Sequence, residues 1–193
     1  MIRASLILFL LLCEIFSVRS TNPLYTKKDI LIDDKIVGTW SNDDKAKWKF
    51  TKEGEGYKLA LVDKNGNNAE FDVHLLTLGK YKFMDIYLTR FDHNVGKNLD
   101  ECGLLHPFSH AFMRVDSIDN EMKLKTFNSK WLEKTVEKNP DLIKHNKINK
   151  NNKVSILLTA ETSELQSFIL KNAEGEAFKS EFVLKQMNKP LSE

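Results

Sequence analysis

The chain has 193 residues, 41% of them hydrophobic and 29% charged, which is the composition of one globular domain large enough to bury a real core. Its 29 basic and 27 acidic residues almost cancel, so no field of one sign is available to attract nucleic acid or anionic lipid. Nucleic acid is therefore not an expected partner, and removal of residues 1–20 would not change that conclusion.

The first segment, "MIRASLILFLLLCEIFSVRS", has the pattern of a secretory signal peptide. Arg3 forms the basic region of the signal, and Ala4–Leu12 forms its apolar region. The apolar region is shorter than the roughly 20 residues that a transmembrane helix needs. Val18 and Ser20 suit the recognition positions of signal peptidase. The pattern predicts cleavage before Thr21, an exported periplasmic or secreted protein, and no transmembrane helix in the mature chain.

A lipoprotein signal is the alternative, in which acylated Cys13 would anchor the mature chain to a membrane. Leu10 fits this pattern, whereas Leu12 occupies a position that normally requires a small residue. If Cys13 leaves with the leader, Cys102 is the only thiol and no internal disulfide can form. We then expect the core to supply the stability.

Alternation with a period of two predicts consecutive antiparallel strands after an N-terminal extension, residues 21–35. Ala46, Trp48 and Phe50 alternate with lysines and form one half-buried strand. The turn sequences "EGEG" and "DKNGN" lead into two more strands, which contain Tyr57, Leu59, Leu61, Phe71, Val73 and Leu75. Further strands are predicted over residues 82–90, 108–116 and 122–127, with an irregular stretch from residue 91 to about residue 106.

Helical spacing replaces alternation at Ser129, a candidate N-cap, and ends at Pro140. The polar tract "KHNKINKNNK", residues 144–153, is interpreted as an exposed loop, and nucleic-acid contact there is a weak alternative because no aromatic residues interleave its lysines. Residues 154–159 predict another strand.

A second helix is predicted after Ser163, which resembles a capping box with Gln166. Its apolar stripe, Leu165, Phe168 and Ile169, is interpreted as packing surface. Phe182 and Leu184 mark the closing strand.

These elements predict a mainly β fold: an antiparallel up-and-down β-barrel of eight to nine strands, with two short helices in the C-terminal half. Closing the sheet on itself removes its exposed edges. The barrel domain is expected over residues 36–187, followed by a tail, residues 188–193.

The stretch "KIVGTW" begins the first barrel strand, and its Gly38-Thr39-Trp40 resembles the G-x-W signature of lipocalins and related calycins. The resemblance implies that Trp40 plugs the closed end of the barrel beneath a basic side chain from the last strand. Lys185 would take that place here, where the family usually has arginine. Gly38 would let the backbone approach closely where the chain enters the barrel.

The longer run from Gly38 to Leu88 also resembles uncharacterised bacterial exported proteins with a lipocalin-like domain, and the resemblance covers most of residues 36–186. An ordinary buried strand start is the alternative interpretation of Gly38 and Trp40. Both readings give these residues a structural role.

The segment "DECGLLHPFSH" is the best metal candidate, because Cys102, His106 and His110 could hold zinc with Asp100 or Glu101. The spacing matches no common zinc-finger pattern, and Pro107 breaks any helix that would align the histidines. We therefore assign no metal or cofactor, and His110 is interpreted as a strand residue near the barrel mouth or a satisfied core histidine.

The sequence contains no G-x-S-x-G motif and no glycine-rich phosphate loop leading into a helix. The adjacent carboxylates Asp33-Asp34 and Asp43-Asp44 are interpreted as solvated turn residues rather than a glycosidase pair. A non-enzymatic protein is therefore expected.

Three functions remain open. The first is binding of a small hydrophobic or amphipathic molecule inside the barrel, between aromatic residues such as Tyr57, Phe71, Tyr87 and Phe112. Tyr87 and Phe112 flank the long 91–107 connection, and His110 would lie near the mouth. Arg114 would either orient a carboxylate there or, as the favoured alternative, form a surface salt bridge. The second is a non-enzymatic envelope interaction or structural protein with a filled barrel. The third is a metal-dependent enzyme using Cys102, His106 and His110.

Overall fold

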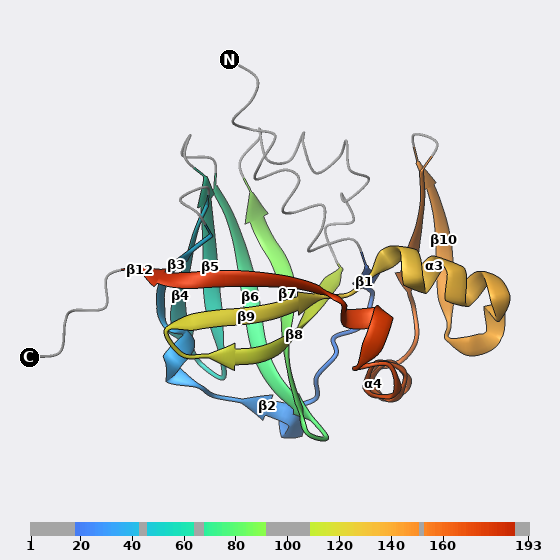
Figure 1. Ribbon diagram of the computed structural model, residues 1–193, viewed down its shortest axis with the longest axis horizontal. Helices are drawn as coiled ribbons and strands as arrows, with labels where there is room; N and C mark the ends of the chain where they lie inside the picture. The colour runs from blue at the N-terminus through green and yellow to red at the C-terminus, as the bar shows by residue number, and fades with distance from the viewer. Residues whose placement is uncertain (1–17, 43–45, 64–67, 92–108, 151–152, 188–193) are drawn as a thin grey trace, which may run out of the picture.

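The computed structural model describes residues 18–42, 46–63, 68–91, 109–150 and 153–187. Its main feature is a closed antiparallel β-barrel, which confirms the predicted fold class (Figure 1). The eight barrel strands are β3 (Gly38–Ser41), β4 (Ala46–Glu53), β5 (Gly56–Asp63), β6 (Asn68–Leu78), β7 (Tyr81–Phe91), β8 (His110–Ile118), β9 (Glu121–Thr126) and β12 (Ser180–Met187).

The strands from β3 to β9 follow one another as a meander, each paired antiparallel with the next. The last strand, β12, returns between β9 and β3 and pairs antiparallel with both. Pairing all eight strands in a ring leaves no barrel edge exposed along this path.

The period of two decides which side chains enter the barrel. In β4, Ala46, Trp48 and Phe50 are buried whereas Lys47 and Lys49 are exposed, as the alternation predicted. The same rule on the other strands fills the interior with large apolar side chains: Trp40, Tyr57, Leu59, Leu61, Phe71, Val73, Leu75, Met84, Ile86, Met113, Met122, Leu124 and Leu184. The barrel therefore encloses a packed core.

A second layer covers part of the outside of the barrel. It comes mainly from the long connection between β9 and β12, which lies on the right of Figure 1. That connection contains α3 (Ser129–Lys138), η3 (Pro140–Leu142), β10 (His145–Lys150), β11 (Lys153–Leu158), α4 (Thr162–Lys171) and η4 (Gly175–Phe178). The N-terminal segment adds β1 (Arg19–Ser20), η1 (Lys27–Asp29), β2 (Ile30–Leu31) and η2 (Asp34–Ile36).

This layer creates a second hydrophobic core on the outer face of the sheet. The barrel contributes Leu76, Phe83 and Phe112, which alternate with interior residues along their strands. The added layer contributes Leu24, Phe127, Leu132, Val136, Ile156, Leu165, Phe168, Ile169 and Phe178. The apolar stripe of the second helix is thus packing surface, as interpreted from the sequence.

The polar tract 144–153 is not the loop that its composition suggested. Residues 145–150 form β10, which pairs antiparallel with β11 in a hairpin. Hairpin pairing with an apolar strand, β11, overrides the weak strand propensity of asparagine and lysine.

The helix starts differ from the expected caps. Asn128, one residue before Ser129, is the N-cap of α3, and its side chain accepts a hydrogen bond from Trp131 N at 3.1 Å. The capping box expected at Ser163 is wrong, because Gln166 donates instead to Leu24 O at 2.9 Å and to Asp29 Oδ2 at 2.8 Å. Gln166 therefore fastens the N-terminal segment to α4.

Geometry explains the glycines at positions 38 and 56. Gly38 has a φ of 134°, a backbone conformation that L side chains rarely adopt, so its conformation explains this glycine better than the close approach expected from the sequence. A Cβ atom on Gly56 would lie 2.7 Å from Val73 O, closer than real Cβ contacts allow. The start of β5 thus depends on a residue without a side chain, because β6 approaches it closely.

The N-terminal extension is tied to the rest of the fold. Leu24 is fully buried in the second core, and Thr162 Oγ1 donates to Pro23 O at 2.9 Å. Upstream of it, β1 pairs with β8 and runs parallel to β11. Neither helix among the described residues has the length and apolar composition that a membrane-spanning helix needs.

Candidate functional site

The residues predicted to bind a ligand share one face of the sheet, but it is the outer face. Along β8, His110, Phe112 and Arg114 alternate with Ala111 and Met113, which belong to the interior core. Tyr87 of β7 lies opposite His110, on the same outer face. Because a strand alternates its side chains strictly, these four residues cannot line the barrel interior, and that expectation was wrong.

Phe112 is not available to a ligand. It is 1% exposed and belongs to the second core, where its ring lies 5.6 Å from that of Phe127. Its role is to hold the added layer against the barrel.

Tyr87 and His110 belong to a partly buried polar cluster around Asp85. The two rings lie 4.8 Å apart, and His110 Nδ1 is 2.6 Å from the Oδ1 atom of Asp85, which accepts the hydrogen bond. The other oxygen of Asp85 accepts a hydrogen bond from Leu24 N at 2.7 Å. Asp85 is only 1% exposed, so this carboxylate connects β7, β8 and the N-terminal segment inside the protein.

His74 extends this cluster, since it lies opposite Asp85 in the register of β6 and β7. Its ring stacks on Tyr25 at 4.2 Å. Burial lowers the pKa of His74 below its ordinary value, and burial also raises the pKa of Tyr25. The cluster is therefore adapted to a neutral imidazole and a neutral phenol.

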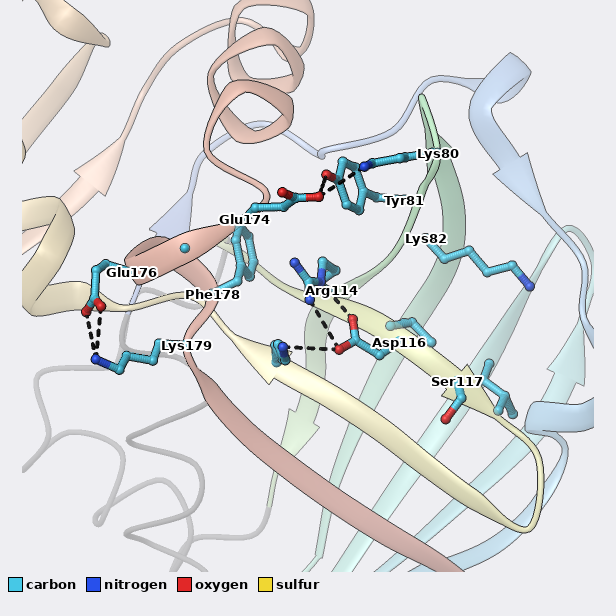
Figure 2. A pocket seen from close by; sticks show the side chains of 14 residues that line it. Lys80, Tyr81, Lys82, Arg114, Asp116, Ser117, Glu174, Glu176, Phe178 and Lys179 are labelled. Carbon is cyan, nitrogen blue, oxygen red and sulfur yellow. Dashed lines mark hydrogen bonds and ion pairs between the residues drawn. The ribbon is translucent and has the colours of Figure 1, made fainter.

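Arg114 points into a cleft of about 700 Å³ on the outside of the barrel (Figure 2). The floor of the cleft comes from the start of β7, the end of β8 and Lys125 of β9, and η4 forms its opposite wall. Five basic side chains line it, Lys80, Lys82, Arg114, Lys125 and Lys179, together with three acidic ones, Asp116, Glu174 and Glu176.

The ion pairs in the cleft are unequal. Lys80 Nζ lies 3.1 Å from Glu174 Oε1, and Lys179 Nζ lies 2.9 Å from Glu176 Oε1, so each of these two lysines has its own partner. On the floor, Asp116 is shared: Arg114 Nε donates to it at 2.7 Å and Lys125 Nζ lies 3.4 Å from it. Two cations therefore face one carboxylate.

Arg114 is held firmly in place. Besides Asp116, it donates through Nη1 to Ala173 O, and its guanidinium lies 5.7 Å from the centroid of the Tyr81 ring. Partial burial raises the pKa of Asp116, but the hydrogen bonds and positive charges of Arg114 and Lys125 together outweigh that effect and leave the pKa below its ordinary value. Asp116 is therefore ionised at neutral pH and fixes the guanidinium.

Tyr81 and Phe178 supply the aromatic part of the cleft. Tyr81 donates a hydrogen bond to Glu174, which also lies beside Lys80 (Figure 2). Phe178 is 1% exposed, so it contributes mainly an apolar base beneath η4.

Of the predicted structural signature, Trp40 lies where it was expected and Lys185 does not. Trp40 is fully buried in the interior core and donates through Nε1 to Ile36 O at 2.8 Å. Lys185, however, is exposed and lies opposite Ser41, whereas Gln186 lies opposite Trp40. The strand register thus gives Gln186, not Lys185, the place beside the tryptophan.

The indole N–H of Trp48 is a buried hydrogen-bond donor in the barrel interior. Trp48 is 1% exposed, and its Nε1 atom has no hydrogen-bond partner among the described residues. Its ring packs against Phe50 and Phe182, with centroids 6.3 and 5.6 Å away.

The zinc hypothesis rests mainly on residues outside the described ranges, because Cys102 and His106 fall within 92–108. Within the described part of the chain, no group of three or more His, Cys, Asp or Glu side chains is arranged to hold a metal ion. His110 itself is engaged by Asp85.

Arg19 of β1 is an unusual buried residue. It is 2% exposed, and its Nε and Nη1 atoms have no hydrogen-bond partner among the described residues. Burial lowers its pKa, which reflects the cost of placing a guanidinium away from water.

Several residues of the cleft were not singled out from the sequence: Tyr81, Asp116, Lys125 and Glu174. Alternation along β8 could have indicated that Arg114 and Asp116 share a face. No local pattern could have indicated that Ala173, 59 residues later in the chain and just before η4, would accept a hydrogen bond from Arg114.

These observations define the class: a closed, antiparallel eight-stranded β-barrel with a packed interior, an added outer layer and a charged cleft between them. Comparison with protein-family models, curated proteins and solved structures found no match.

Proposed function

We propose that this protein is a non-enzymatic binding protein whose outer cleft holds a small amphipathic molecule with an anionic group. The observation that carries the proposal is the sharing of Asp116 between Arg114 and Lys125 on the floor of the cleft. This site replaces the barrel interior, which is occupied by large side chains.

The charge balance supports an anionic ligand. Lys80 and Lys179 are paired one to one, and Lys82 extends toward Asp33, 3.5 Å away. Among the residues that the structure describes, one positive charge on the floor has no carboxylate of its own. This excess positive charge would attract an anion that enters the cleft. The carboxylates of the cleft would compete little with the anion, because they are already paired with other cations.

The geometry of Arg114 supports a preorganised site. Three of its five N–H bonds are used by Asp116 and Ala173 O, which leaves about two for a carboxylate or phosphate oxygen. Its side chain is 12% exposed, so binding would cost little additional rotamer entropy. The adjacent Tyr81 ring offers a surface for the apolar part of the ligand.

The experiment uses 8-anilinonaphthalene-1-sulfonate, a fluorescent amphipathic anion, titrated into the folded protein. Lys125→Met removes the shared charge but keeps the length of the side chain. Lys179→Met is the matched control, because Lys179 is paired with its own glutamate at the rim of the cleft. We expect Lys125→Met to weaken binding by about tenfold, equivalent to ~1.4 kcal/mol, and Lys179→Met to change it by less than about threefold.

Binding should also weaken as ionic strength rises, because part of the cleft is open to solvent. Equal effects of the two substitutions, or binding that does not respond to either of them, would contradict the proposed site.

We also propose that the protein is exported and that its barrel is lipocalin-like. The signal pattern of residues 1–20 supports the first statement. The Gly38-Thr39-Trp40 sequence at the first barrel strand, with Trp40 buried in a closed eight-stranded barrel, supports the second. Cleavage before Thr21 would remove β1, including the poorly satisfied Arg19, whereas acylation of Cys13 would retain it.

A further inference from the structure

We infer that the outer edge of β10 is a docking site for an extended acidic segment of a partner protein. Within the described residues, the order of strands in the sheet ends at β10, which pairs with β11 on one side only. The hairpin projects away from the barrel (Figure 1).

The phase of the ladder identifies which backbone groups face outward. Thr159 N donates to Lys144 O at 2.9 Å, so this pair exchanges bonds across the hairpin. Hydrogen-bonded and non-hydrogen-bonded pairs alternate in an antiparallel ladder. His145, Lys147 and Asn149 therefore turn their N–H and C=O groups away from β11.

The opposite side of the hairpin agrees with this phase. Leu158 lies opposite His145, and its carbonyl oxygen accepts a hydrogen bond from Thr21 N at 2.9 Å, on the side away from β10. The side chains of Lys147 and Asn149 are exposed. The outer edge thus offers a row of backbone donors and acceptors to a further strand.

The charge of the hairpin determines what kind of strand would fit. Between Lys144 and Leu158 the sequence has four lysines and no acidic residue, although the whole chain is nearly neutral. Glutamate or aspartate side chains on an incoming strand would pair with these lysines, since opposite charges on adjacent strands stabilise the pairing. An acidic extended segment meets both requirements.

A second copy of the chain and nucleic acid fit less well. Pairing β10 with β10 around a two-fold axis centred on Lys147 would bring the two copies of this residue together, and like charges that face each other on adjacent strands are destabilising. Residues 144–158 contain no phenylalanine, tyrosine or tryptophan on which bases could stack.

The test uses the complete protein and a fluorescent, capped peptide of alternating glutamate and valine, followed by anisotropy. Lys147→Pro removes the outward N–H without touching the bonds to β11, and proline is tolerated on an edge strand. Lys147→Thr removes the charge but keeps the N–H. We expect Lys147→Pro to weaken binding by about tenfold or more and Lys147→Thr by about threefold.

A second measurement does not depend on how well the variants fold. The same peptide with N-methyl groups on alternate backbone amides cannot complete the ladder, and it should bind the wild-type protein at least about tenfold more weakly. Equal binding of the methylated peptide would overturn the inference. Tighter binding of oligouridine than of the peptide, or a wild-type dimer that Lys147→Pro dissociates in sedimentation experiments, would also overturn it.

Discussion

Asp85 provides the sharpest test of how the outer layer is attached to the barrel. Substitution with alanine would remove the acceptor for two hydrogen bonds, from Leu24 N at 2.7 Å and from His110 Nδ1 at 2.6 Å. Leu24 is fully buried and His110 is mostly buried, so water cannot readily replace the lost carboxylate.

The expected magnitude follows from these two bonds. A hydrogen bond to a charged group contributes ~1.5–3 kcal/mol net, so two of them give ~3–6 kcal/mol. We expect Asp85→Ala to lower the free energy of unfolding by an amount within this range, ~3–6 kcal/mol.

The assay is urea denaturation at neutral pH, analysed by linear extrapolation. Lys35→Ala is the control, because its ion pair with Asp119 is exposed (side chains 64% and 69%) and should contribute little to stability. Combining Asp85→Ala with His110→Phe in a double-mutant cycle should give a coupling energy of ~0.5–3 kcal/mol.

A loss below about 1 kcal/mol for Asp85→Ala would refute the reasoning, because that value is typical of surface substitutions. Additive effects of the two substitutions would show that Asp85 and His110 do not interact in solution.

Three further predictions concern other parts of the molecule. Trp40→Ala should lower the free energy of unfolding by ~3–5 kcal/mol in denaturant melts, since Trp40 is fully buried, and a loss below about 1 kcal/mol would place it at the surface. Burial lowers the pKa of His74 below its ordinary value of 6.5, so the unfolded chain takes up a proton at a higher pH than the folded protein does. The stability contributed by neutral His74 should be complete above pH 6.5 and should be lost as the pH falls through the lowered pKa. His74→Gln should reduce this pH dependence of the unfolding free energy in denaturant melts across the same range. If the protein is exported as proposed, intact-mass analysis of the mature form should show a chain beginning at Thr21, and an acylated Cys13 would contradict this prediction.

The barrel was predictable because its signal is local. Alternation in β4 and the turn sequences that follow it specify which residues are buried and where each strand reverses. The same alternation explains why the predicted ligand-binding residues do not line the barrel interior. Met113 and Arg114 are neighbours on one strand, so only one of them can enter the interior, and the apolar one does.

The second layer was less predictable because its contacts are distant in sequence. β10 is a strand because it pairs with β11, not because its asparagines and lysines favour extended structure. Asp85 has no sequence signature, since its partners Leu24 and His110 come from segments 61 and 25 residues away. Only the folded chain brings these groups together.

The arrangement of the two cores explains why the candidate site lies outside the barrel. Tryptophan and phenylalanine side chains fill the interior, so a ligand there would have to displace well-packed groups. Forcing extra atoms into such a core typically lowers the free energy of unfolding by ~1–3 kcal/mol. The connection between β9 and β12 instead lays η4 across the outer face of β7 and β8, and polar side chains meet at that border. There, ligand contacts can be added or changed without disturbing the interior. If this reasoning holds, substitutions at Lys125 should change anion binding while leaving the unfolding free energy almost unchanged, whereas substitutions at Trp40 should do the reverse.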